Sequence, residues 1–168
     1  MHFSGVCFGH QLLSRLLGAT VAPAPSGNWE LGHSEVLLYD VGKKLFRTQD
    51  KSIHLHQMHE DQVVAAPTPE TSNGLLSPAE DKVEVWGYSE HTAVQGVYIR
   101  GRLFTTQAHV AFDEGMVRRQ IEMRVKSGSI DDTEQADEAA ETAHLEHDGD
   151  LVAAAILRFF HDDDEGIE

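Results

Sequence analysis

The segment from Gly5 to Gln11 constrains the fold of this chain more than any other segment. It holds the only cysteine, Cys7, at a Gly-x-Cys-x-Gly corner. A short apolar stretch, Phe3 to Val6, precedes the cysteine, and an amphipathic run, His10 to Leu17, follows it. Glycines two positions before and after a nucleophile permit a sharp turn from a strand into a helix. The sequence therefore predicts a strand, a tight turn at Cys7 and a helix.

Such a turn would hold Cys7 exposed in a strained backbone conformation, with the following backbone N–H groups aimed at one point. The thiol would also lie at a helix N-terminus, where the helix dipole favours the reactive thiolate. Both conditions suit a nucleophile. A lone cysteine more commonly packs in a core as a small apolar side chain, and that alternative stays open at this stage.

The composition limits the class of protein. A chain of 168 residues suffices for one domain with a core. A single cysteine cannot form an internal disulfide, and the sequence shows neither a membrane-length apolar run nor a signal-peptide pattern, so we expect a cytoplasmic location. Thirteen basic against 28 acidic residues give a net charge of −15, which argues against nucleic acid and membrane surfaces as partners.

Strand-like segments in the middle of the chain lie between helix-like segments at both ends. Runs of apolar, β-branched and aromatic residues predict strands at 36–39, 53–56, 63–65, 82–88, 93–99 and 103–106. Helical periodicity marks 12–17, 113–126, 133–146 and 151–160, with a helical turn at 42–46. The pattern predicts an α/β fold in three layers, a mostly parallel sheet flanked by helices. We expect one domain over residues 1–160 and an acidic tail over 161–168.

The strand before Cys7 is short for its expected role. A turn of this kind follows a full strand beside parallel neighbours, and here only Met1 to Val6 precede the cysteine. A parallel sheet that began with this strand would lack the partners that cover its faces and edge. We therefore expect the N-terminal part of the fold to be incomplete, and the exposed edge to favour self-association.

A cysteine nucleophile needs a base, and histidine is the usual one. Among 11 histidines, His109 is the best candidate because it follows the predicted strand 103–106 at its carboxyl end, where open α/β sheets carry their sites. The alternative for His109 is a solvated loop residue. His54 and His56 would point to one side of a strand, as two metal ligands do. No second cluster completes a ligand set, so we expect no metal and no other cofactor.

Together these motifs resemble the class I glutamine amidotransferase domain. The resemblance rests on Gly5–Gln11 and on Thr106-Gln107-Ala108-His109, and it is strongest for the stand-alone branch that includes γ-glutamyl peptidase-like proteins. Weaker similar features follow in the same order, at 28–32, 58–61, 92–96 and 147–149. The resemblance implies a flavodoxin-like fold. It also implies a cysteine hydrolase that acts on the γ-amide of glutamine or of γ-glutamyl compounds through a thioester.

The resemblance also implies roles for particular residues. Cys7 would be the nucleophile, His109 its base, and the backbone N–H of Phe8 one donor to the oxyanion. The residues expected at the substrate are Phe8, Gly9, Gln11 and His59. The expected partner is thus a small molecule, glutamine or a γ-glutamyl compound.

Two departures from the family pattern oppose activity. The family has His-Pro-Glu where this chain has His109-Val110-Ala111, so a methyl group replaces the acid that orients the base. In serine triads, loss of the acid's charge costs about four orders of magnitude in rate. Asp113 and Glu114 are close in sequence but are expected to begin the next helix. The second departure is the missing N-terminal loop that carries the other oxyanion donor in relatives. An inactive member that keeps only the fold or a binding role is therefore the alternative function.

Overall fold

A computed structural model describes residues 1–164 and 166–167 of the chain. Strand β1 (Phe3–Val6) leads through Cys7 into helix α1 (Phe8–Leu16), as the sequence predicts. The elements that follow are, in order, β2 (Val21–Pro23), β3 (Glu30–Leu38), α2 (Asp40–Phe46), β4 (Ser52–His59), β5 (Asp61–Val63), β6 (Glu84–Tyr88), β7 (Gly96–Ile99), β8 (Leu103–Thr106), α3 (Glu114–Lys126), α4 (Thr133–Glu141) and α5 (Gly149–Phe160). The predicted α/β class is confirmed.

The main sheet has six strands in the order β1-β8-β7-β6-β3-β4, and β2 and β5 form a separate pair. Only β1 and β8 pair in parallel, whereas the other described neighbours in this sheet are antiparallel. The prediction of a mostly parallel sheet is therefore wrong. The reason is visible at the turn between β7 and β8, where Arg102 N–H donates to Ile99 C=O at 3.0 Å. A parallel pair needs a crossover of a dozen or more residues, and this connection is far shorter.

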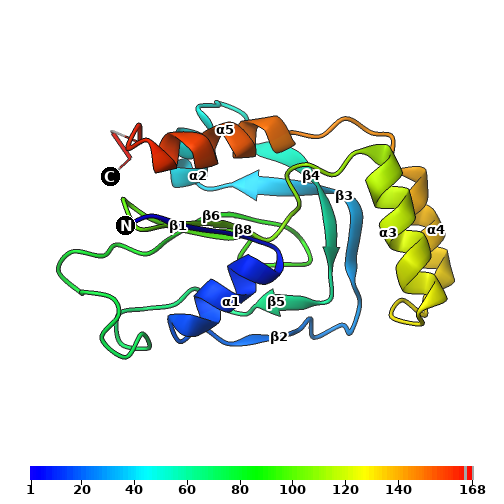
Figure 1. Ribbon diagram of the computed structural model, residues 1–168, viewed down its shortest axis with the longest axis horizontal. Helices are drawn as coiled ribbons and strands as arrows, with labels where there is room; N and C mark the ends of the chain where they lie inside the picture. Colours follow the sequence, from blue (N-terminus) through cyan, green and yellow to red (C-terminus); the bar gives the residue numbers. More distant parts are fainter. Residues whose placement is uncertain (165, 168) are drawn as a thin grey trace.

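Helices cover both faces of the sheet, so the three layers are confirmed (Figure 1). Helices α2 and α5 pack on one face, around a core that includes Trp86, Phe104 and Phe159. Helix α1 packs on the other face, where Leu13 contacts a second core cluster built around Val97. Successive residues of β7 alternate between the two cores because strand side chains point to opposite faces.

The paired strands β3 and β4 extend away from the rest of the sheet, and α3 and α4 cover them (Figure 1). Met58 on β4 shares a buried cluster with Val117 and Ile121 of α3 and with Ala136 and Ala139 of α4. This packing brings Arg124 of α3 to the pocket that Cys7 also lines.

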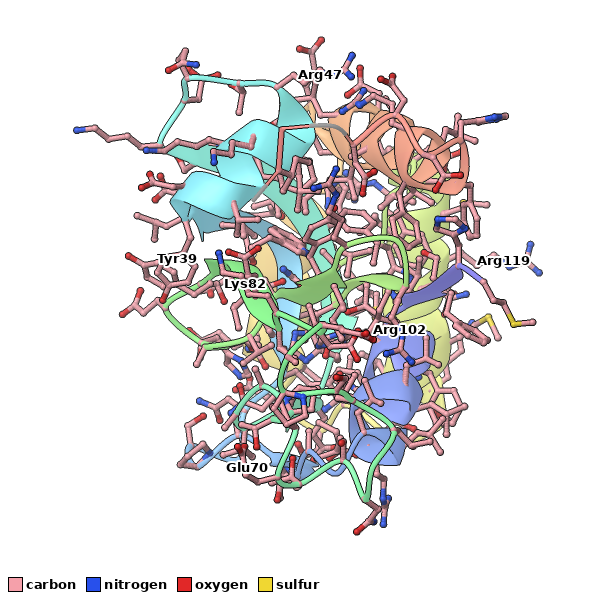
Figure 2. All side chains as sticks on the ribbon, turned by 90° about the vertical axis from the view of Figure 1, so that its left-hand side faces the viewer. Tyr39, Arg47, Glu70, Lys82, Arg102 and Arg119 are labelled. Atoms are coloured by element: carbon pink, nitrogen blue, oxygen red, sulfur yellow. The ribbon has the colours of Figure 1, made fainter. Side chains whose placement is uncertain are left out.

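The described residues after α5 turn back on the body of the protein. The Tyr98 hydroxyl donates to the Asp164 carboxylate, and Ile167 is buried in the core cluster that contains Trp86. Arg47, at the end of α2, pairs with Asp163 at 3.1 Å and is exposed at the surface (Figure 2). Glu165 and Glu168 of the expected acidic tail lie outside the described residues. Among the helices that the structure describes, none has the length and apolar character that crossing a membrane requires.

Candidate active site

The turn at Cys7 has the strained geometry that the sequence predicts. Cys7 has φ 51° and ψ −107°, a region that residues with a side chain rarely adopt. Its backbone N–H donates to Thr106 C=O at 2.8 Å, which ties the turn to the end of β8. A Cβ added at Gly5 would lie 2.5 Å from the backbone carbon of Gly9, so close approach of β1 and α1 requires glycine at position 5. A Cβ at Gly9 would meet nothing within 4 Å.

The Cys7 thiol lies in a partly buried environment. It donates to Met58 C=O at 3.9 Å and accepts from the Gln107 side-chain amide at 3.7 Å. Burial raises the pKa of the thiol, and the Phe8 N–H, the Arg124 charge and the Gln107 amide offset this only in part. The helix terminus therefore does not by itself produce the thiolate. A nucleophilic Cys7 needs a base to remove its proton.

Cys7 opens into a pocket of about 200 Å³ formed by segments distant in the sequence. Two other residues predicted for the substrate site, Gln11 and His59, also line it. The Gln11 amide donates to Asp61 C=O at 2.7 Å and to the Gln107 side-chain oxygen at 3.2 Å, which fixes its position beside the thiol. The full lining is Cys7, Gln11, Trp29, Met58, His59, Glu60, Asp61 and Arg124.

His109 follows β8 as expected, and its ring stacks on an aromatic side chain. The backbone N–H of His109 donates to His56 C=O at 3.1 Å. The imidazole stacks on Phe112, with ring centroids 3.9 Å apart and planes inclined by 8°. Within the described part of the chain, no hydrogen bond joins the His109 ring to Cys7. Burial lowers the pKa of His109 to about 4, and the charges of His59 and Arg124 add to that effect, so the ring is neutral at pH 7.

Within the described residues, no carboxylate hydrogen-bonds to the His109 ring. Ala111 is exposed. Asp113 caps α3 by accepting from Met116 N–H at 2.7 Å, and Glu114 pairs with Arg118 at 2.9 Å. Both acids thus begin the next helix, as the sequence predicts, and their carboxylates are engaged there.

Arg124 is a pocket residue that the sequence analysis missed. It projects from α3 into the pocket, and its guanidinium lies 5.4 Å from the centroid of the Trp29 ring. Its Nε is buried and has no hydrogen-bond partner among the residues that the structure describes. The charge of Arg124 influences the pKa of both Cys7 and His109. A signal was available, because Arg124 follows the buried Ile121 by three positions on a helix and therefore shares its inward side.

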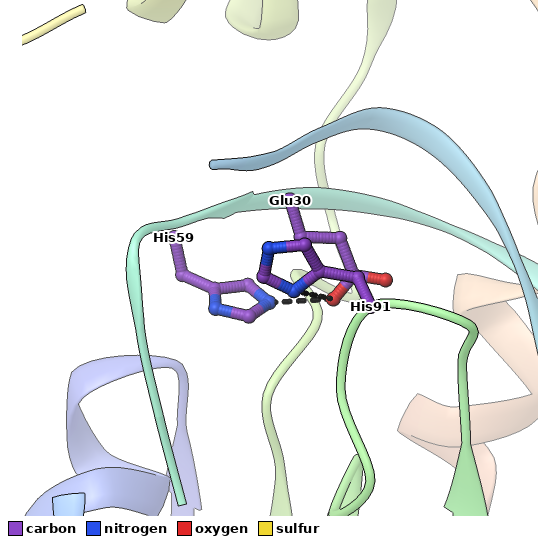
Figure 3. Close-up of side chains that lie close together, drawn as sticks. All are labelled: Glu30, His59 and His91. Atoms are coloured by element: carbon purple, nitrogen blue, oxygen red, sulfur yellow. Dashed lines mark hydrogen bonds and ion pairs between the residues drawn. The ribbon is translucent and has the colours of Figure 1, made fainter. Parts of the chain in front are cut away.

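Beside this pocket lies a buried polar cluster of Glu30, His59 and His91 (Figure 3). His59 ends β4, and its Nε2 lies 2.7 Å from a Glu30 carboxylate oxygen. Burial raises the pKa of Glu30, but hydrogen bonds from His59, Ser89 and Thr92 outweigh burial and leave the pKa below its usual value. The sequence analysis assigned a role only to His59 of these three.

His54 and His56 form part of a second histidine cluster. Both rings contact His33 on the paired strand β3, at centroid distances of 5.0 and 5.5 Å respectively, so they share a strand face as predicted. His147, from the loop before α5, contacts His56 at 5.0 Å. The nearby Asp148 carboxylate accepts from His54 N–H at 2.7 Å, which anchors this loop to β4.

The family model of "Glutamine amidotransferase class-I" matches residues 2–113, which include the Cys7 turn, Gln11, His59 and His109. The chain belongs to the class-I glutamine amidotransferase family. Two provisionally named yeast proteins are similar to it. One is a glutamine amidotransferase-like protein of Schizosaccharomyces pombe, 27% identical over 92% of this chain and 56% of that protein. The other is a glutamine amidotransferase of Saccharomyces cerevisiae, 30% identical over 70% of this chain and 41% of that protein.

The family fold also appears in solved structures. The structure of a glutamine amidotransferase from Methylobacillus flagellatus matches with a TM-score of 0.67 and 19% identity, over 95% of this chain and 62% of that one. This likeness supports the fold. The chain spans about half the length of the curated relatives it matches.

Proposed function

We propose that this class-I glutamine amidotransferase family member is a cysteine hydrolase that acts on the γ-amide of glutamine or of γ-glutamyl compounds. The observation that supports this most is the Cys7 thiol, held at positive φ and opening into a pocket with Gln11 and His59. A buried structural cysteine has no need of a strained backbone or of an open cavity.

In the proposed reaction, the neutral His109 imidazole takes the proton of the Cys7 thiol. The thiolate forms a C–S bond with the γ-carbonyl carbon, and the Phe8 N–H stabilises the oxyanion. Collapse of the tetrahedral intermediate breaks the C–N bond. The amide nitrogen takes the proton from His109 and leaves as ammonia or an amine. Water then hydrolyses the thioester and releases the acid. The His109 ring stacks on Phe112 and makes no hydrogen bond to the sulfur within the described residues, so the first step requires such a bond to form.

Arg124 supplies a positive charge to the pocket, which the acidic Glu60 and Asp61 also line. Glutamine and γ-glutamyl compounds carry an α-carboxylate, and a guanidinium with an unpartnered, buried Nε is a strong donor to a carboxylate. The Arg124 charge near the thiol therefore supports substrate binding with the γ-amide directed at Cys7.

A second candidate function is a member without catalysis that keeps the fold or a binding role. The exposed Ala111 at the acid position favours it, as does the stacking of His109 on Phe112. In both cases we propose a small-molecule ligand. A cytoplasmic location belongs to the same proposal and rests on the single free cysteine.

The proposal is tested by measuring glutamate release from glutamine and from γ-glutamyl dipeptides. We expect activity that Cys7→Ala abolishes and that His109→Gln lowers by about 100-fold or more, the usual contribution of a general base. His144→Gln, at an exposed position in the same chain, serves as the control and should keep full activity. A folded wild-type protein with no activity on any of these substrates would favour the second candidate.

A further inference from the structure

We propose that Glu30, His59 and His91 bind one divalent transition-metal ion of the zinc type. One ligand atom from each side chain lies within 4.8 Å of the other two, and the three come from separate segments of the chain (Figure 3). This inference is independent of the proposed hydrolysis.

The hydrogen bonds of the two histidines to backbone carbonyls fix which ring nitrogen is left to face an ion. His59 donates from Nδ1 to Asp61 C=O at 2.8 Å, and His91 donates from Nε2 to Asn28 C=O at 2.8 Å, because a carbonyl can only accept. An ion would use the lone pairs of His59 Nε2 and His91 Nδ1. Those are the two nitrogens that face Glu30. His59 Nε2 would give up the proton that it donates to Glu30, and the Thr92 hydroxyl, 2.8 Å from His91 Nδ1, would turn away.

Metal-binding histidines typically donate their second ring nitrogen to a backbone carbonyl or a carboxylate, which orients the ring. Both histidines do so here. Glu30 is oriented in the same way, since Ser89 donates to one carboxylate oxygen and Gln95 donates to the other at 3.0 Å. All three ligands thus have the second layer of contacts that a metal site requires.

Two of the three separations between ligand atoms lie near those of a tetrahedral ion, and the third is within 4.8 Å. Glu30 Oε2 lies 2.7 Å from His59 Nε2 and 3.9 Å from His91 Nδ1. Ligands bound to one zinc ion at about 2.0–2.2 Å lie roughly 3.3–3.6 Å apart. An ion would therefore widen the first separation and narrow the second. Two imidazoles and one carboxylate are a known zinc ligand set, with a fourth position for water.

The site is buried but reachable. Glu30 is 5% exposed and His59 4% exposed, which excludes bulk water from the carboxylate. A cavity of about 360 Å³ reaches Glu30 and His91 from the surface, with the exposed Glu90 at its wall. Because His59 also lines the Cys7 pocket, an ion here would lie next to the candidate active site.

The cluster around His56 is a weaker candidate and provides the control. His33 Nε2 bonds to Glu146 C=O at 2.8 Å, and His147 Nδ1 accepts from Gly149 N–H at 3.1 Å. Neutral His147 thus carries its proton on Nε2. The His147 Nδ1 lone pair accepts from a backbone N–H, which cannot turn away as the Thr92 hydroxyl beside His91 can. The imidazole rings of this cluster contact one another by their faces and edges.

The experiment is calorimetric titration of the chain, freed of metal by a chelator, with Zn²⁺, and titration with Co²⁺ followed by visible absorption. We expect one ion per chain in the wild type. His91→Gln, at the least buried ligand, should weaken binding by at least about tenfold, and Glu30→Gln likewise. His54→Gln, at the exposed ring of the other cluster, should leave binding unchanged.

Zinc X-ray absorption of the wild-type complex identifies the ligands without any variant, so it tests the site even if a variant fails to fold. We expect two imidazole ligands and no sulfur neighbour. The proposal is overturned by a wild type that does not bind, by loss of binding in His54→Gln with retention in His91→Gln, or by a sulfur neighbour, which would place the ion at Cys7.

Discussion

Cys7 keeps its unusual backbone conformation because the residues around it permit a close approach of strand and helix. Gly5 lies against the backbone of Gly9, and Cys7 N–H is tied to the end of β8. The sequence analysis required both glycines for the turn, yet only Gly5 is required by contacts in the described structure. A Cβ at position 9 would enter open space.

Replacing each of the two glycines in turn tests whether the turn needs glycine because of close packing or merely tolerates it. Gly5→Ala would place a Cβ at 2.5 Å from the Gly9 carbon, so β1 and α1 must move apart. We expect a loss of about 1–3 kcal/mol in the free energy of unfolding, measured with urea. Gly9→Ala is the matched control and should change stability by under about 1 kcal/mol, since alanine favours a helix. Equal losses in the two variants would contradict this account of the turn.

Arg124 is expected to act on substrate binding rather than on stability. If its guanidinium holds the α-carboxylate, Arg124→Gln should raise KM for glutamine by roughly 10-fold to 100-fold, the range for hydrogen bonds to charged groups. The effect on kcat should be smaller. Arg119→Gln, on the exposed side of the same helix, is the control (Figure 2). An unchanged KM in Arg124→Gln would remove Arg124 from the substrate site.

At the scale of elements, β4 carries residues of both histidine clusters and a wall of the Cys7 pocket. Its residues from Leu55 to His59 are all buried, and this includes polar side chains such as His56 and Gln57. The sequence predicted a strand only at 53–56, because the residues that follow are mostly polar and polar residues usually mark loops. Tertiary contacts reverse that preference here, since α3 and α4 cover this end of the strand.

Burial of His56 on β4 predicts a pH dependence of stability. Burial lowers its pKa to about 4, and the neighbouring His147 and His33 add to the effect. Between pH 6.5 and 4 the unfolded chain therefore binds a proton that the native state does not, and stability falls as the pH falls. The contribution is up to about 1.4 kcal/mol per pH unit. We expect the free energy of unfolding of His56→Gln, measured by denaturation from pH 7 to 4.5, to fall less with pH than that of the wild type. The free energy of unfolding of the control His144→Gln should fall as much as that of the wild type.

At the scale of the whole molecule, the three layers and most elements were predictable from local patterns, but the strand order was not. Helical periodicity predicts α1, α3 and α5, and β-branched residues predict β6 to β8. The predicted bounds lie within a few residues of the observed ones. Strand direction depends on which strands pair, and short turns impose antiparallel pairs that no single segment encodes. Arg124, Glu30 and His91 escaped detection for a related reason, because contacts between distant segments give them their roles.

The position of β1 at one edge of the main sheet predicts self-association. Phe3 on this strand is 50% exposed and lines an apolar cavity with Leu16 and Arg102. Phe3→Lys should reduce association, because a charge on an edge strand opposes pairing with another chain. Leu157→Lys, at an exposed apolar residue of α5, is the control. Light scattering at micromolar concentration checks this, and a monomeric wild type would contradict it.

The central claim is that Cys7 is a nucleophile at a site that recognises glutamine. The most direct measurement is the mass of the protein after incubation with 6-diazo-5-oxo-norleucine, a diazoketone analogue of glutamine. We predict one covalent adduct per chain, located on the peptide that contains Cys7 and absent from Cys7→Ser. A folded wild-type protein that stays unlabelled, or that is labelled elsewhere, would contradict the claim.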